Sequence, residues 1–374
     1  MGSEAVYNSS LTPELHRVAS LDALRGFTMF WIIGGEMLFE SISQLTGWHW
    51  LGRQMRHVSW NGFSFMDLIF PLFMFAVGVS IFISTSRGLE KGKSKKELYY
   101  KAFRRMLILV FLGLVYKNAP LSFDVSKTRF VSVLGRIGIT GFAVVFIVLN
   151  HRVRGQITWL FGILAAYWAA MKLIPVPGYG AGVLTLEGNL AGYVDRNVLP
   201  GRLIQGVFDE NGILTTVPCI SIVLLGALAG KLLLSDRFTK YRKVIYLALA
   251  GIACLCLAGV WGLSFPINKH LWSSSFVMLT TGLSLLLLSL FYLIIDVWGY
   301  KTWSFPFIVI GLNSVTIYMA CRLIDFSHTA NLLLDGIIKS SSESTGTLIL
   351  AIGTLTLEWL FLYFLYRKNI FLKV

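Results

Sequence analysis

Charged residues are scarce in this sequence. Asp, Glu, Lys and Arg make up 14% of the 374 residues, 55% are hydrophobic, and the mean hydropathy is +0.69. This composition lies outside the range of soluble globular proteins. The sequence also lacks any polar stretch long enough to form a separate soluble module. We therefore predict one transmembrane domain over 21–366, with cytoplasmic tails at 1–20 and 367–374.

Cysteine is also rare, with four residues in the whole chain. Cys219, Cys254 and Cys256 fall inside apolar segments, where a cysteine is typically a small buried hydrophobic residue. The spacing of Cys254 and Cys256 matches neither a zinc site nor a redox motif. The sequence therefore predicts no disulfide framework and no metal site.

Two further features are missing. Residues 1–20 are polar, so no cleavable signal sequence is visible, and we expect the first apolar segment to be retained as a transmembrane helix. No internal repeat is visible either, which speaks against a transporter built from inverted repeats.

Long apolar runs are what the sequence has in quantity. About 20 apolar residues are needed to cross ~30 Å of hydrocarbon. The predicted spans are 24–43, 62–85, 102–118, 130–149, 156–175, 214–234, 243–263, 272–296, 304–322 and 347–366. The predicted fold class is therefore an all-α polytopic membrane protein with about ten transmembrane helices.

The basic residues predict how these spans are oriented. With both termini in the cytoplasm, 21 of the 33 Lys and Arg residues fall on the inner side. This excess is the positive-inside signal, so the predicted topology is N-in and C-in. It also accounts for the net charge of +14 without nucleic acid as a partner.

Ionisable and amide side chains inside the predicted spans share one half of the bilayer. At a rise of ~1.5 Å per residue, Glu36, Asp67 and Arg136 all fall in the outer half. Asn313 and Ser314 come near the middle of the ninth span. A charge in hydrocarbon costs several kcal/mol unless it is paired or hydrated, so we expect these groups to face a cavity or one another.

His57 lies just outside this region and precedes Trp60, Asn61 and Asp67 closely. A histidine beside a carboxylate is the minimal general-base pair, and we predict that Glu36 orients His57 in this way. The remaining histidines carry no functional expectation: His16, His49, His151, His270 and His328. For Asp67 and Arg136, a purely structural ion pair between helices is an open alternative.

A basic segment faces the predicted cytoplasmic side. Eight cations lie between Arg87 and Arg105, including Arg104, and Arg25 lies near the start of the first span. The charges are either a topology signal solvated by lipid headgroups or a docking surface for a phosphate-bearing ligand. On the opposite side, the 38-residue segment 176–213 is long for a simple connection, which favours a lid or a binding loop.

An ordered series of motifs resembles one known family, that of heparan-alpha-glucosaminide N-acetyltransferase and its bacterial relatives. The matching segments are Ser20–Gly26, His57–Gly62, Asp67–Pro71, Val133–Gly138, Phe208–Leu214, Gly226–Lys231, Ile267–Ser273 and Gly311–Ser314. Two features depart from the family pattern. The lysosomal enzymes carry a large lumenal domain before the first span, whereas about 20 polar residues precede it here. In addition, Glu36 stands at a position where those enzymes have asparagine. Both departures are what a resemblance to the bacterial branch of the family implies.

The resemblance implies ten or eleven spans, acetyl-CoA as a cytoplasmic donor and an amino-sugar acceptor on the outer face. It implies that His57 is the active-site histidine. Residues expected near the acceptor or the acyl channel are Trp60, Asn61, Asn268, Lys269, Trp272, Asn313 and Ser314. Residues expected to bind the donor are Arg136, Arg104, Arg105 and Arg25. The family also implies a bacterial inner-membrane location and makes a homodimer plausible.

Two mechanisms and two rival functions remain open at this point. His57 either deprotonates the acceptor directly or carries the acetyl group itself. Arg136, Asn268 or Asn313 would stabilise the oxyanion of the thioester. The rivals are a transporter whose buried charges form a substrate or proton path, and an O-acyltransferase of a surface glycan.

Overall fold

The computed structural model describes residues 18–119 and 124–371, and most of them are helical. Six of the described helices are long and apolar enough to cross a membrane, and a bent pair of shorter helices gives a seventh candidate. The fold is therefore that of an all-α polytopic membrane protein. Ten spans and the N-in, C-in orientation remain predictions. Most of the predicted N-terminal tail, and residues 372–374 of the C-terminal one, lie outside the described residues.

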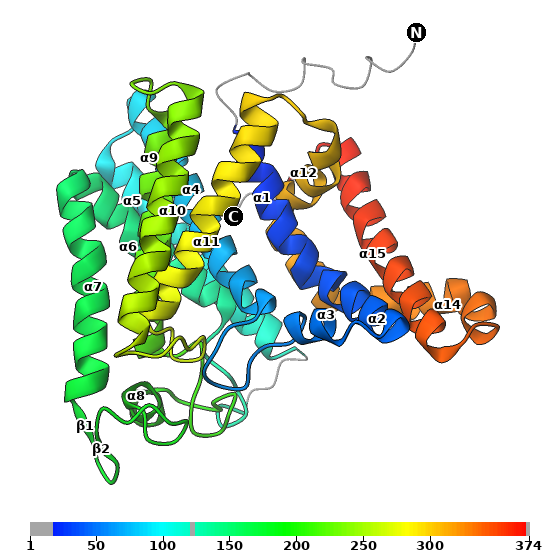
Figure 1. The fold of residues 1–374 in the computed structure, drawn as a ribbon, viewed down its shortest axis with the longest axis horizontal. Coiled ribbons are helices and arrows are strands. Elements are labelled where there is room, and N and C mark those ends of the chain that lie inside the picture. The colour runs from blue at the N-terminus through cyan, green and yellow to red at the C-terminus, as the bar shows by residue number, and fades with distance from the viewer. Residues whose placement is uncertain (1–17, 120–123, 372–374) are drawn as a thin grey trace.

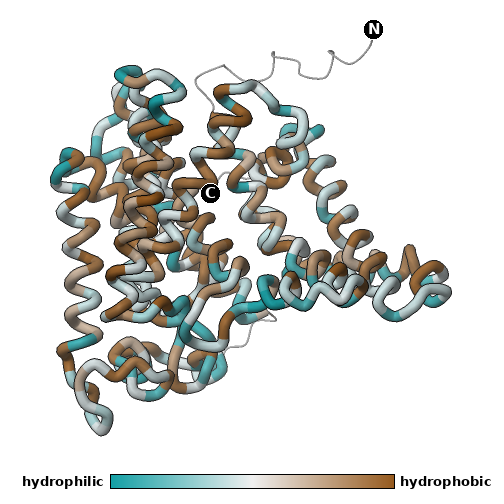
Figure 2. Tube along the Cα trace, in the orientation of Figure 1, coloured by the Kyte–Doolittle hydropathy of each residue, from teal (hydrophilic) through white to brown (hydrophobic). Residues whose placement is uncertain are grey.

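The long helices follow the predicted apolar runs closely. They are α4 (Phe65–Glu90), α5 (Lys95–Lys117), α6 (Val133–Asn150), α7 (Val153–Leu173), α9 (Ile213–Leu234), α10 (Lys240–Gly262), α11 (Ser274–Tyr292) and α15 (Glu343–Arg367). Several begin at a serine or threonine whose hydroxyl accepts a backbone N–H of the first turn, as Ser132 does for α6 and Ser273 for α11. Figure 2 shows apolar residues along the helices and polar ones gathered at the connections.

Two predicted spans are broken. The first consists of α1 (Ala19–Phe30), a π-helical turn (Trp31–Gly35) and α2 (Glu36–Thr46). The ninth consists of a short 3₁₀ turn (Thr302–Ser304), α12 (Phe305–Leu312) and α13 (Ser314–Leu323), and its two parts meet at 65°. α11 also ends in a π-helical turn (Leu293–Val297). The sequence pattern predicted continuous helices, because apolar composition does not reveal where the helical hydrogen bonding changes.

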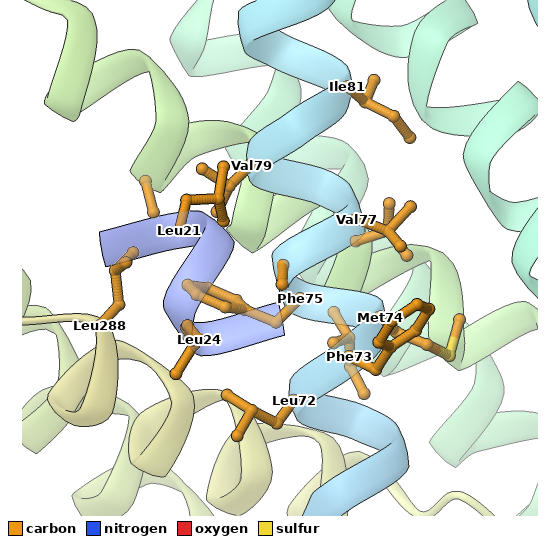
Figure 3. Packing of buried hydrophobic residues seen from close by; sticks show 14 of the residues in the cluster. Leu21, Leu24, Leu72, Phe73, Met74, Phe75, Val77, Val79, Ile81 and Leu288 are labelled. Carbon is orange, nitrogen blue, oxygen red and sulfur yellow. The ribbon is translucent and has the colours of Figure 1, made fainter. Parts of the chain in front are cut away.

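The core forms around α4, which packs against α1, α6, α9 and α11. Leu24 of α1, Leu72 and Phe75 of α4 and Leu288 of α11 meet in this core (Figure 3). α4 and α9 approach closely because both carry glycine at their crossing. A Cβ on Gly78 would lie 1.9 Å from a backbone oxygen of α9.

The segments that carry the site residues lie together at one end of the bundle (Figure 1). The same end also holds α3 (His49–Gln54), the hairpin of β1 (Pro175–Val176) and β2 (Gly180–Ala181), and α8 (Leu190–Val198). β1 and β2 pair antiparallel, with Pro175 opposite Ala181. The remaining helix, α14 (Phe326–Lys339), packs against α15.

Candidate active site

Asp67 is fixed by the start of α4. Ser64 is the N-cap and Asp67 is the third helical residue, so the two form a capping box. Asp67 Oδ2 accepts the backbone N–H of Ser64 at 3.0 Å and its hydroxyl at 2.9 Å. The side chain of Asp67 is completely buried. Its second oxygen therefore has a fixed position from which to hold another group.

That group is His57. Its Nδ1 lies 2.8 Å from Asp67 Oδ1, while 47% of the imidazole side chain remains exposed. A carboxylate can only accept a hydrogen bond, so Nδ1 carries the proton and Nε2 is the free acceptor. This is the tautomer that a general base requires. The carboxylate that orients His57 is thus Asp67, and the predicted Glu36–His57 pair is wrong in this respect.

Lys269 shares the same carboxylate. Its Nζ lies 3.5 Å from Asp67 Oδ1, and the side chain is 10% exposed. Burial lowers the pKa of Lys269, and the carboxylates of Glu210 and Asp67 oppose that shift. Glu36 is also close enough to interact electrostatically with both Lys269 and His57. We call His57, Asp67, Lys269, Glu210 and Glu36 the His57 cluster.

The loops that carry His57 and Lys269 are joined by Asn61 and Asn268. The two residues form an isolated β-bridge, and Asn268 Nδ2 donates to Asn61 Oδ1 at 3.0 Å. Asn268 Oδ1 also accepts the backbone N–H of Leu271 at 2.8 Å. The structure therefore brings both predicted substrate-binding asparagines to the site, where their amide groups hold the two loops in register.

Trp60 connects the site to the long segment 176–213. Its ring stacks on His270 with centroids 5.3 Å apart, and its Nε1 donates to the carbonyl of Leu184 at 2.9 Å. His270 in turn lies 3.7 Å from a carboxylate oxygen of Glu210. One ring face and the N–H of Trp60 are thus used to hold the segment against the His57 loop.

Arg136 lies beside the start of α9. Its guanidinium donates to the hydroxyls of Thr215 and Thr216 and to the carbonyl of Glu210, and it lies 4.9 Å over the ring of Trp272. Among the described residues no ion pair joins Arg136 to Asp67, which rules against the alternative of a structural pair between them. Arg136 Nη1 is buried and has no hydrogen-bond partner among the described residues.

Comparison with known proteins identifies the family. The family model described as heparan-alpha-glucosaminide N-acetyltransferase, catalytic, matches residues 17–267, which is more than half of the chain. The chain belongs to this family. It is 30% identical to the human heparan-alpha-glucosaminide N-acetyltransferase over 425 aligned residues and 28% identical to the mouse protein over 415. The alignments cover 98% and 96% of this chain but 61% of each relative, so the chain spans about three fifths of their length.

The heparan-alpha-glucosaminide N-acetyltransferase match contains His57, Asp67, Arg136 and Glu210, and it ends just before Lys269. Two residues at the site were not predicted from the sequence. Glu210 belongs to a recognised motif but was given no role, and His270 was set aside. No local signal marks His270, because its contacts with Trp60 and Glu210 arise only when distant loops meet.

A buried ion pair was missed as well. Arg129 binds Asp209 through two hydrogen bonds of 2.7 and 2.6 Å, and both side chains are almost fully buried. The two residues are separated by 80 positions, so spacing could not reveal the pair. It anchors the residue before Glu210 and so helps to position that carboxylate.

Other predicted residues lie away from the His57 cluster. Arg104 is exposed on α5, and Arg105 is close enough to Arg25 of α1 to interact electrostatically. Asn313 Nδ2 donates to the carbonyl of Ile370, beyond the C-terminal end of α15. The hydroxyl of Ser314, the next residue, donates a hydrogen bond to the carbonyl of Gly311.

The break that carries Asn313 lies beside the first turns of α1, since a Cβ on Gly311 would meet the backbone oxygen of Asp22 at 2.1 Å. The expectation that Asn313 and Ser314 lie together with Glu36 and Asp67 is therefore wrong. The bend at Asn313 turns the chain, so counting a constant rise along a straight span misplaced both residues.

Proposed function

We propose that this chain is an integral-membrane acetyltransferase that moves the acetyl group of acetyl-CoA to the amino group of a glucosamine-like sugar. The observation that carries the proposal is the His57–Asp67 pair, in which a buried carboxylate holds a half-exposed imidazole with Nε2 free. Membership in the heparan-alpha-glucosaminide N-acetyltransferase family supports this reading over a transporter.

In the proposed reaction His57 Nε2 takes a proton from the acceptor amine as its nitrogen attacks the thioester carbon. A carbon–nitrogen bond forms, the carbon–sulfur bond breaks, and the imidazolium returns the proton to the departing sulfur. The products are the N-acetyl sugar and the thiol of coenzyme A. Asp67 holds the ring and stabilises the imidazolium between the two proton transfers.

Negative charge develops on the thioester oxygen during the attack, so a fixed cation nearby lowers the barrier. Lys269 supplies such a cation, since its Nζ lies 3.5 Å from the Asp67 oxygen that also binds His57. Arg136 retains a buried N–H donor that no described residue uses. We assign oxyanion stabilisation to Lys269 first, because Arg136 is already held by Thr215 and Thr216.

The donor would approach from the opposite side of the membrane. Arg25, Arg104 and Arg105 would bind its phosphates, and its pantetheine arm would reach between helices toward His57. This assignment rests on the predicted N-in orientation. The bacterial inner membrane as location and a homodimer as assembly are further expectations of the family resemblance.

Direct transfer is preferred to an acetylated His57, because the bond from Nδ1 to Asp67 leaves Nε2 as the proton acceptor that direct transfer requires. Incubation with labelled acetyl-CoA, without acceptor, followed by rapid denaturation and digestion at neutral pH separates the two routes, because acid would hydrolyse an acetylated imidazole. Label retained on the peptide that contains His57 would establish the acetyl-enzyme. O-acylation needs the same base, so it is separated by comparing glucosamine with N-acetylglucosamine as acceptor.

The deciding experiment measures acetyl transfer from radiolabelled acetyl-CoA to glucosamine by the purified protein. We expect transfer by the wild type and by His328→Ala, which removes an exposed histidine of α14. We expect almost none by His57→Ala with an unchanged elution profile. Equal rates in the wild type and His57→Ala would refute the assignment of the base.

A further inference from the structure

In the His57 cluster, Glu36 is the member whose charge is not neutralised by a hydrogen bond or an ion pair with a described residue. Asp67 binds His57, Ser64 and Lys269, and Glu210 pairs with His270. Glu36 accepts no hydrogen bond and forms no ion pair with a described residue. Its side chain is half-buried, and the turn before it lies against the start of α4, where the ring centroids of Trp31 and Phe65 are 4.8 Å apart. Glu36 also interacts electrostatically with His57, Lys269 and Glu40.

The position of Glu36 depends on the π-helical turn directly before it. A π-helical turn contains an additional residue, which rotates all following side chains about the helix axis, and such turns are frequent at functional sites. Gly34 and Gly35 allow neighbouring side chains to pack closely against this turn. A Cβ on Gly34 would lie 2.9 Å from a methyl group of Leu355, and one on Gly35 would lie 2.7 Å from the ring of Phe30.

The charges of the cluster favour a positively charged ligand. Asp67 and Glu36 both face the ammonium of Lys269, while Glu210 also faces Lys117 and His270. While His57 is neutral, as a base must be, the cluster carries an excess of negative charge. An amine that reaches His57 from water arrives largely as an ammonium ion, so its charge complements that excess.

We infer that Glu36 is the counter-ion of the acceptor ammonium and that it selects amino sugars over neutral sugars. The inference rests on the proposed function, since it deepens the acceptor side of the same reaction. Glu36 holds the R–NH₃⁺ group beside His57 until it loses one proton to water. The neutral amine then attacks the thioester as described above, and each transfer releases one proton in total.

The inference is tested by comparing Glu36→Gln with the wild type, using glucosamine as acceptor. Because a hydrogen bond to a charged group contributes about 1.5–3 kcal/mol, we expect KM to rise by roughly tenfold or more, and by a larger factor than kcat falls. Wild-type kcat/KM should decrease with ionic strength, and that of the variant should decrease less. Glu36→Asp keeps the charge and should recover part of the loss.

Glu40→Gln is the matched control. Glu40 lies one turn further along α2, but its carboxylate already pairs with Arg56, at 2.5 Å on the surface. The KM of Glu40→Gln for glucosamine should stay within about twofold of the wild-type value, since exposed ion pairs contribute little free energy. Equilibrium dialysis of glucosamine and N-acetylglucosamine provides a readout that does not depend on turnover. The wild type should prefer glucosamine, and Glu36→Gln should lose most of that preference.

The outcomes separate the two proposals. Wild-type transfer with the same KM and ionic-strength dependence in Glu36→Gln would overturn the role of Glu36 and leave the acetyltransferase intact. Equal binding of both sugars by the wild type would also overturn it. A wild type that acetylates no amine would instead overturn the proposed function, and the counter-ion role with it.

Discussion

Among single residues, His57 and Asp67 show how a helix start supports a base. The capping interaction with Ser64 occupies one oxygen of Asp67 and leaves the other aimed at Nδ1 of His57. The same short segment therefore starts α4 and fixes the tautomer of the imidazole. A change at Asp67 should affect both chemistry and local structure, and the two effects can be measured separately.

Asp67→Asn should lower kcat about 100-fold or more, because an amide cannot stabilise the imidazolium or enforce the tautomer with Nε2 free. The acetyl-transfer rate and the thermal midpoint are measured together. Asp335→Asn, in an exposed pair with Lys339 on α14, is the control and should behave like the wild type. A rate for Asp67→Asn close to the wild type would contradict the proposed orientation of His57.

Asp195 predicts a pH effect on stability. Burial raises the pKa of Asp195 to about 6, and its Oδ1 accepts the backbone N–H of Ile213 at the start of α9. Since the folded state binds this proton more tightly than the unfolded state, stability should fall as pH rises from about 4 to 6. In Asp195→Asn this contribution should vanish. A difference in thermal midpoint between variant and wild type that stays constant from about pH 6 to 4 would refute it.

The sequence predicted most of the residues that lie at the site. It did not predict which side chains form hydrogen bonds and ion pairs with one another. Ser64 and Asp67 have the spacing of a capping box, and His57 stands out beside them. The choice of Asp67 over Glu36 as the partner of His57 depends on distances that no spacing gives. Likewise Arg129 and Asp209 meet only through the tertiary fold, and the contacts of His270 require two loops to come together.

Among the helices, two broken spans lie against each other. α1 with its π-helical turn packs on α12, and a Cβ on Gly26 would meet the carbonyl oxygen of Phe307 at 1.6 Å. The apolar runs correctly predicted where helices lie. They could not predict the breaks, because leucine and isoleucine favour burial in a π-helical or bent helix as well as in a straight one.

Gly78→Ala should destabilise the crossing of α4 and α9. The new methyl group would meet the carbonyl oxygen of Val223 at 1.9 Å, so the helices must separate, at a cost of about 1–3 kcal/mol. Gly162→Ala is a matched control on α7, where a Cβ meets no atom within 4 Å. The thermal midpoint of the detergent-solubilised protein should fall by several degrees for Gly78→Ala and not for Gly162→Ala. Equal midpoints would contradict the close approach.

For the whole molecule, the fold gathers the long segment 176–213 and the His57 loop at one end. Trp60 joins them through Leu184. The basic segment that contains Arg104 and Arg105 begins at Arg87, in the last turn of α4, whereas Asp67 lies in the first turn of that helix. The proposed reaction therefore requires that donor and acceptor approach from opposite sides of the membrane.

This orientation predicts the result of cysteine labelling. Glu187→Cys, in 176–213, should react with a membrane-impermeant maleimide in intact cells, and Lys93→Cys, before α5, should react only after permeabilisation. Both positions are exposed, and the native cysteines lie within helices. The opposite labelling pattern would reverse the proposed sidedness of acetyl-CoA and acceptor.

The π-helical turn at Trp31–Gly35 has a consequence for how relatives should be aligned. A turn of this kind arises from the insertion of a single codon into a helix. A homologue that lacks the insertion continues as a regular α-helix, and every later side chain is rotated by about 100°. Residues that share a column with Glu36 then point in different directions, so a one-residue gap here can mark a change of acceptor between branches.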